Sequence, residues 1–96
     1  MPRLIWSPRA LQDVQRLYEF LQPKSEDAAR RAALSIRNSI RALAKHPEIG
    51  RPVDGAPPEF RELVIEFGQA GYIARYRYDG RGVSVIAIRS GREAGY

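Results

Sequence analysis

Residues 61–91, RELVIEFGQAGYIARYRYDGRGVSVIAIRSG, decide the fold class of this chain. Apolar and polar side chains alternate there in three runs with the period of half-buried strands: residues 62–67, 72–78 and 83–89. Glycine-rich turns separate the runs, and Asp79-Gly80 in the second turn is a strong hairpin signal. The stretch therefore predicts three consecutive antiparallel strands, the last of which ends at Ser90-Gly91.

Two amphipathic helices are predicted before these strands. The first begins at Ser7-Pro8, an N-cap residue followed by a proline in the first turn, and ends before Pro23. The second begins at Ser25 and runs to about Lys45. Their apolar faces are Leu11, Val14, Leu17, Tyr18 and Leu21 in the first, and Ala29, Ala33, Ile36, Ile40 and Leu43 in the second. Because the connection is short, we expect an antiparallel helical hairpin.

The remaining segments complete the predicted order β-α-α-β-β-β. Residues 3–6 are a short apolar run that favours a strand, and residues 46–58 are rich in proline and glycine and predict a loop. The fold class is therefore α+β, an antiparallel sheet with a helical hairpin packed on one face. Residues 1–96 are expected to form a single domain, because a second core would have too few residues.

The composition excludes several kinds of site. The chain has no cysteine, which removes disulfides, thiolate metal ligands and a cysteine nucleophile. Its single histidine, His46, leaves no imidazole pair for zinc and reads better as a charge at a helix C-terminus than as a base. We expect no metal and no cofactor. No apolar run approaches the ~20 residues of a membrane helix, so a cytoplasmic protein without a membrane partner is expected.

The charge points to an anionic partner. Lysine and arginine number 16 against 11 acidic residues, which gives a net charge of +5, and all but Lys24 and Lys45 are arginines. Arginine offers a planar fork of donors that suits phosphate and carboxylate groups. The partner would be a nucleic acid or an acidic protein segment, and the alternative is that the arginines simply solubilise the surface.

The arginines of the second helix and the sheet form two groups. Arg30, Arg37 and Arg41 share one side of the second helix, either as a solvated edge or as a docking strip for an acidic segment. Arg75 and Arg77 share one face of their strand. The tyrosines of that strand take the opposite face, which favours a place in the core over a stacking platform for nucleic acid: Tyr72, Tyr76 and Tyr78.

A third group follows the last strand and consists of Arg89, Arg92, Glu93 and Tyr96. Arginine could stabilise the transition state of phosphodiester cleavage, and tyrosine or glutamate could move a proton. The same residues are equally consistent with a frayed polar tail.

Taken together, several segments resemble the ParE/RelE superfamily of toxins from type II toxin–antitoxin systems. The order and spacing of these segments are more specific than any one of them, and they span nearly the whole chain. They are Trp6-Ser7-Pro8-Arg9-Ala10 with Asp13, the Pro47–Arg51 turn, the Arg61–Ile65 strand, the Tyr72–Tyr76 strand, and Ile86–Glu93 with its Gly-Arg end.

The resemblance implies a toxin that arrests growth, is linked to plasmid stabilisation, and is neutralised by a cognate antitoxin. In this superfamily the antitoxin wraps the toxin with its C-terminal segment, and an acidic segment would suit the charge of +5. The candidate antitoxin-binding residues are Arg30, Arg37, Arg41, Arg75 and Arg77.

The resemblance leaves two targets open. RelE-like members cut mRNA on the ribosome, whereas ParE-like members poison DNA gyrase. The nuclease-type candidates are Arg51, Arg61, Arg92 and Tyr96, and the target-binding candidates are Arg89, Arg92 and Glu93. The chain lacks a lysine cluster in the Gly50–Gly55 loop and a histidine in its last strand. These differences favour a gyrase poison that is not an enzyme. The alternatives are an mRNA endoribonuclease and a nontoxic relative that only binds the antitoxin.

Overall fold

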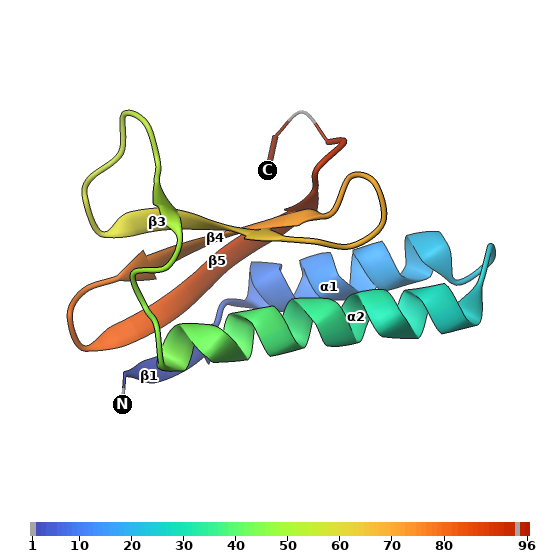
Figure 1. The fold of residues 1–96 in the computed structure, drawn as a ribbon, viewed down its shortest axis with the longest axis horizontal. Helices are drawn as coiled ribbons and strands as arrows, with labels where there is room; N and C mark the ends of the chain where they lie inside the picture. Colours follow the sequence, from blue (N-terminus) through green and yellow to red (C-terminus); the bar gives the residue numbers. More distant parts are fainter. Residues whose placement is uncertain (1, 94) are drawn as a thin grey trace.

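Two long helices lie against one face of a five-stranded sheet in the computed structural model, which describes residues 2–93 and 95–96 (Figure 1). The elements in chain order are β1 (Arg3–Trp6), α1 (Pro8–Leu21), α2 (Glu26–Arg41), the 3-10 turn η1 (Ala42–Ala44), β2 (Arg51–Pro52), β3 (Phe60–Ile65), β4 (Tyr72–Tyr78) and β5 (Gly82–Ser90). The predicted α+β class, with a helical hairpin on one face of the sheet, is confirmed.

The sheet has the strand order β1-β5-β4-β3-β2. The β3-β4-β5 part is the antiparallel meander that the alternating pattern predicts. β1 runs parallel to β5, with Leu4 opposite Val83, so the sheet is mixed rather than purely antiparallel. β5 is the last strand in sequence, yet it lies between β1 and β4.

Three details differ from the sequence prediction. The predicted loop over residues 46–58 contains the two-residue strand β2, because Arg51 and Pro52 pair with Glu62 and Arg61 of β3. The second helix ends at Arg41 and continues as η1, short of Lys45. The strand predicted to reach Phe67 ends at Ile65, where β3 stops. The carbonyl of Phe67 instead accepts the Gly71 N–H and helps to close the turn between β3 and β4.

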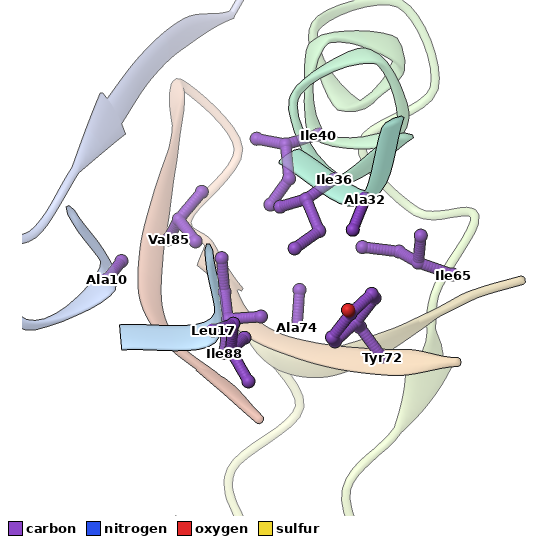
Figure 2. Close-up of a cluster of buried hydrophobic side chains, with 10 residues drawn as sticks. All are labelled: Ala10, Leu17, Ala32, Ile36, Ile40, Ile65, Tyr72, Ala74, Val85 and Ile88. Atoms are coloured by element: carbon purple, nitrogen blue, oxygen red, sulfur yellow. The ribbon is translucent and has the colours of Figure 1, made fainter. Parts of the chain in front are cut away.

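The core lies between the helical hairpin and the sheet, and Figure 2 shows its main cluster. The cluster joins Ile36 and Ile40 of α2 and Leu17 of α1 to Ile65 and Ile88 of the sheet. On α2 the buried alanines are Ala29 and Ala32, while the predicted Ala33 is only half-buried. The buried stripe follows steps of three and four residues from Ala29 through Ala32 to Ile36, which leaves Ala33 at its margin.

β4 separates its two faces as predicted. Tyr72 and Tyr76 are buried on the side of the helices, whereas Arg75 and Arg77 lie on the other side, called the open face below. Tyr78 is half-buried and packs against the second core cluster. The tyrosines of this strand therefore contribute to the core.

Beyond the end of β1, side chains at the start of α1 bond to the backbone of β5. The Ser7 hydroxyl donates to the carbonyl of Ile86 at 2.8 Å and also accepts the Ala10 N–H as the N-cap of α1. The Asp13 carboxylate, further along α1, accepts the N–H of Ile88 at 2.8 Å. Side chains of the helix thus satisfy backbone groups of β5 that have no strand partner beyond Trp6.

None of the helices in the described part of the chain has the length and apolar character needed to cross a membrane.

Candidate functional site

A group of charged side chains gathers on the open face around Glu62. Glu62 stands opposite Arg75 across the β3–β4 ladder and opposite Arg51 across the β2–β3 ladder, so the three side chains share one face. Arg75 Nη2 donates to Glu62 Oε2 at 2.9 Å, and Arg51 Nη2 lies 3.5 Å from Glu62 Oε1. These residues, together with Arg89 and Tyr96, are called the open-face cluster below.

Tyr96 docks onto this cluster. Its hydroxyl donates to Glu62 Oε2 at 3.1 Å. The guanidinium carbon of Arg75 lies 4.5 Å from the centre of the tyrosine ring, and that of Arg89 lies 5.2 Å from it. Both distances are within the range of cation–π attraction. Tyr96 is therefore held by named contacts, and the alternative prediction of a frayed tail is wrong for this residue.

The docking of Tyr96 shifts the pKa of both Tyr96 and Glu62. Burial raises the pKa of Tyr96 to about 12, and the nearby charge of Glu62 and the hydrogen bond to it act in the same direction. Partial burial alone would raise the pKa of Glu62, but the hydrogen bonds from Arg75 and Tyr96 outweigh it, so this pKa is lowered. At neutral pH the site therefore holds a neutral phenol and a carboxylate between guanidinium ions.

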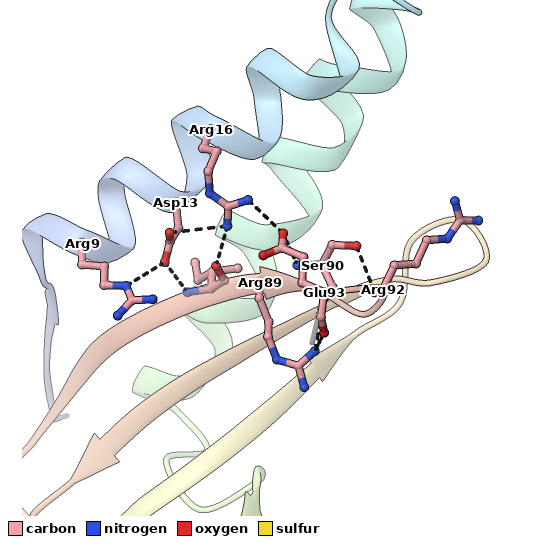
Figure 3. A network of polar contacts seen from close by, with 8 residues as sticks. Arg9, Asp13, Arg16, Arg89, Ser90, Arg92 and Glu93 are labelled. Atoms are coloured by element: carbon pink, nitrogen blue, oxygen red, sulfur yellow. Dashed lines mark hydrogen bonds and ion pairs between the residues drawn. The ribbon is translucent and has the colours of Figure 1, made fainter. Parts of the chain in front are cut away.

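A second polar network joins α1 to the end of β5 (Figure 3). Arg16 Nη1 donates to Glu93 Oε1 at 2.9 Å, and Arg16 Nη2 lies 3.5 Å from Asp13 Oδ1. The same Glu93 oxygen accepts the Ser90 N–H at 3.3 Å, and Arg89 Nη1 donates to the Glu93 carbonyl at 2.9 Å. Partial burial would raise the pKa of Glu93, but the hydrogen bond from Arg16 outweighs it and the pKa is lowered. Glu93 and Arg89 thus anchor the segment that follows β5.

Arg61 lies on the opposite face of the sheet from the open-face cluster. It stands across from the buried Tyr76, and its Nη1 donates to the carbonyls of Glu48 at 3.1 Å and Gly50 at 2.7 Å. The hydroxyl of Tyr76 accepts the Gly50 N–H at 2.9 Å. Arg61 and Tyr76 together hold the loop between η1 and β2 against the sheet.

The other candidate arginines are dispersed. Arg92 is exposed, and its Nη2 lies 3.4 Å from Gln69 Oε1 at the rim of an apolar pocket of about 510 Å³. Arg77 Nη1 lies 3.8 Å from Asp79 Oδ2. The three candidate arginines among the four on α2 are exposed: Arg30, Arg37 and Arg41. Arg37 and Arg41 line a pocket of about 450 Å³ beside β1 and α1.

Three residues that matter here are absent from the candidates drawn from the sequence: Asp13, Arg16 and Glu62. Strict alternation along residues 62–67 places Glu62 on one face of β3, but the register that brings it opposite Arg75 is a long-range property. Across residues 2–93 and 95–96, no group of three or more His, Asp or Glu side chains is arranged to hold a metal ion.

Comparison with known proteins supports the resemblance over nearly the whole chain. Residues 4–95 match the family described as the ParE toxin of type II toxin–antitoxin system, parDE. Toxin RelE1 of Caulobacter vibrioides is 37% identical over 87 residues, which covers 91% of this chain and 90% of the relative. Toxin RelE3 of the same bacterium is 34% identical over 86 residues, covering 90% of each chain. Putative toxin Y4kP of Sinorhizobium fredii is 33% identical, covering 90% of this chain and 84% of the relative.

A solved structure shares the fold. A chain of the chromosomal ParDE TA system from P. aeruginosa superposes with a TM-score of 0.76, covering 94% of this chain and 96% of that chain at 21% identity. The element order, the helical hairpin on one face and the family match agree with one another. The chain therefore belongs to the ParE/RelE superfamily of toxins of type II toxin–antitoxin systems.

Proposed function

We propose that this toxin acts in the cytoplasm by inhibiting DNA gyrase, that it thereby blocks replication, and that a cognate antitoxin with an acidic C-terminal segment neutralises it. The observation that supports this proposal is the dispersal of the nuclease-type candidates. Arg51 and Tyr96 lie on the open face, Arg61 lies on the other face, and Arg92 lies at the rim of the apolar pocket. Concerted cleavage of a phosphodiester requires such groups to converge on one reacting atom.

The state of Tyr96 also favours binding over cleavage. Its hydroxyl donates to Glu62, and its pKa of about 12 keeps the proton in place at neutral pH. An effective general base has a pKa near the working pH. The arrangement therefore suits a surface that binds a partner.

The alternative is a ribosome-dependent mRNA endoribonuclease. Two observations favour it: the relatives named RelE, and the arginines that share the open face with Tyr96. Cationic side chains beside an aromatic ring suit single-stranded RNA.

Pulse-labelling of DNA and protein synthesis after induction of the chain in bacteria separates the two targets. We expect DNA synthesis to fall first, and we expect purified chain to inhibit supercoiling by gyrase. Tyr96→Phe should retain this toxicity, as should the matched control Tyr18→Phe on α1. Earlier loss of protein synthesis, abolished by Tyr96→Phe alone, would favour the nuclease. If neither synthesis falls while the folded chain accumulates, the chain is a nontoxic relative.

A further inference from the structure

The net charge of the chain is concentrated on α2 and η1. Residues 28–46 contain five of the 16 basic residues and none of the 11 acidic residues. The 11 basic residues elsewhere balance the 11 acidic ones, so this one segment accounts for the whole net charge of +5. The two acidic residues of α2, Glu26 and Asp27, lie in its first turn. The rest of the helix therefore carries only positive charge.

Three arginines form a line along the exposed side of α2: Arg30, Arg37 and Arg41. They lie within about 40° of one another around the helix axis, and at 1.5 Å per residue the line is about 16 Å long. The buried Ile36 and Ile40 are rotated by roughly 80–120° from its middle and pack in the core. The line, called the α2 arginine stripe below, therefore faces solvent.

Among the described residues, two of the three stripe arginines have no ion-pair partner. Arg30 Nη2 lies 3.9 Å from Asp27 Oδ1, whereas no described carboxylate pairs with Arg37 or Arg41. Like charges four residues apart weaken a helix, so the Arg37–Arg41 pair is unfavourable for α2 on its own. A polyanion bound along the stripe would remove this repulsion.

We propose that the α2 arginine stripe binds the phosphate backbone of double-stranded DNA. Duplex DNA carries one phosphate charge about every 1.7 Å along its axis, so a length equal to the stripe presents about ten phosphates. Arginines release the cations condensed on those phosphates, and this release drives binding without a fitted pocket. The exposed Asn38, next to Arg37, supplies a further side chain of a type that contacts phosphate.

The residues around the stripe favour a duplex over a single strand and over an acidic protein segment. Residues 28–46 contain no Phe, Tyr or Trp, and proteins that hold single strands stack the bases on aromatic rings. An acidic peptide has no condensed cations to release, and its ion pairs with exposed arginines add little affinity. A dense and regular array of phosphates uses the stripe best.

The stripe and the open-face cluster lie on different sides of the molecule. Both helices cover the face of the sheet opposite that cluster (Figure 1). DNA bound along α2 would therefore leave the open face free for a protein. The inference goes beyond the proposed function, because inhibition of gyrase does not itself require the toxin to touch DNA.

The test is a titration of a short fluorescein-labelled DNA duplex of mixed sequence with the full chain, followed by fluorescence anisotropy at several salt concentrations. For three phosphate contacts, the logarithm of the association constant should fall against the logarithm of the salt concentration with a slope of about −2.7. Replacing all three stripe arginines by glutamine should weaken binding at low salt by about tenfold or more and remove most of this slope.

The matched control removes the same charge elsewhere, in a chain with Arg9→Gln, Arg77→Gln and Arg81→Gln. These three arginines are exposed and lie on α1, on β4 and in the turn before β5. The control should retain most of the affinity and the slope. Because all the substituted residues are exposed, both variants should fold, and circular dichroism checks that they do.

A measurement on the unmutated chain removes any dependence on the variants. In ¹⁵N-edited NMR spectra, the Nε–H signals of Arg37 and Arg41 should shift as the duplex is added, while that of Arg77 stays in place. Equal losses of affinity in the stripe variant and in the control would overturn the proposal. So would stripe-dependent binding that is tighter for polyglutamate, or for a single strand of the same length, than for the duplex.

The titration contains no gyrase, so its result is independent of the proposed target. A chain that inhibits supercoiling but binds the duplex no better than its stripe variant does would reject the inference and retain the proposed function. Stripe-dependent binding by a chain that leaves gyrase active would support the inference and reject the proposed function.

Discussion

Gly50 is the residue at which the loop after the helices comes closest to the sheet. Its N–H donates to the hydroxyl of the buried Tyr76, and its carbonyl accepts from Arg61. A Cβ atom at this position would lie 2.6 Å from Tyr76 Oη and 2.8 Å from the carbonyl oxygen of Glu62. The Pro-x-x-Gly-Arg turn therefore needs glycine because there is no room for a side chain.

We predict that Gly50→Ala destabilises the protein by about 1–3 kcal/mol, the usual cost of overpacking a tight site. Neither the buried ring of Tyr76 nor the backbone of Glu62 can move away freely. The free energy of unfolding in urea measures the effect. Gly95→Ala is the control, since no described atom lies within 4 Å of a Cβ there. Equal stability of the two variants would contradict the prediction.

The ionisation of Tyr96 gives a second prediction at this scale. Its pKa of about 12 in the folded chain exceeds the ordinary value of 10.0, so the folded state holds the phenol proton more tightly. The resulting stabilisation is fully present below pH 10 and is lost as the pH rises from 10 towards 12.

The free energy of unfolding of the original chain should exceed that of Tyr96→Phe by an amount that shrinks across that interval. The phenolate absorbance that is present in the original chain and absent from Tyr96→Phe should appear near pH 12. Urea unfolding at several pH values and ultraviolet titration measure the two quantities. Tyr18→Phe serves as the control, since Tyr18 lies on α1 away from the cluster. Titration of Tyr96 at its ordinary value would show that the ring does not dock on the arginines.

Side chains at the start of α1 supply the hydrogen bonds to β5 that a longer β1 would otherwise make. β1 pairs with β5 only as far as Trp6 opposite Val85, and beyond that point Ser7 and Asp13 satisfy the backbone of β5. Asp13 is 8% exposed and is the single charged residue among the buried ones described. The spacing from Ser7 to Asp13 places both oxygens along one strand edge, which gives a physical reason for this part of the superfamily motif.

We predict that Asp13→Ala costs about 1–3 kcal/mol, because it leaves the buried N–H of Ile88 without an acceptor. Asp13→Asn should cost less, since its amide oxygen can still accept. Hydrogen exchange of the Ile88 amide is the direct measurement and should accelerate in Asp13→Ala. Asp27→Ala on α2, where the carboxylate is exposed, should leave both stability and exchange unchanged. Unaltered exchange at Ile88 in Asp13→Ala would disprove the role.

The helical hairpin depends on Ile40. Its side chain is fully buried between α2 and the sheet, so we predict that Ile40→Ala costs about 2–5 kcal/mol. Leu34, on the same helix, is 54% exposed, and Leu34→Ala should cost much less. Thermal and urea unfolding of both variants test the assignment, and similar losses would mean that the buried face of α2 is wrongly identified.

The elements that sequence could predict are those with local signals. Caps at Ser7 and Ser25 and regular apolar spacing gave both helices, and alternation gave β4 and β5 nearly to the residue. β2 escaped prediction because its two residues have no period and are defined only by pairing with β3. The apolar pattern does not distinguish Ala32 from Ala33, because adjacent alanines are equally apolar and only packing against the sheet decides which one is buried.

The candidate site was less predictable because it depends on register and on a tail. Alternation places Arg75 on the face opposite the tyrosines, but no local feature brings Glu62 or Arg51 beside it. Tyr96 follows a segment without periodicity, so its return to the sheet is decided by ring–guanidinium contacts between distant residues. From the sequence alone Arg61 is a candidate catalytic residue. In the structure it donates to the carbonyls of Glu48 and Gly50 and so holds a loop.

On the scale of the whole molecule, the charge of +5 acts before any contact forms. Exposed arginines lie both on α2 and on the sheet, so an acidic partner is attracted to two sides of the toxin. Long-range attraction of this kind raises association rates and is weakened by salt.

We predict that the association rate with an acidic antitoxin falls by about tenfold or more between low and high salt. Replacing three of the four α2 arginines by glutamine (Arg30, Arg37 and Arg41) should lower the association rate, whereas Arg75→Gln should chiefly raise the dissociation rate. Stopped-flow and surface-plasmon measurements separate the two rates. An association rate that is insensitive to salt would show that charge does not guide this encounter.

The position of β5 bears on how the protein is made. During translation β1, both helices and β4 are synthesised before β5, yet β5 is the strand that joins β1 to the rest of the sheet. A nascent chain that stops before residue 82 has two sheet fragments and no strand to connect them. Pairing between segments so far apart in sequence forms late in folding. Truncated products of damaged messages should therefore remain unfolded and harmless, and the toxin gains its shape only once the whole sheet has been synthesised.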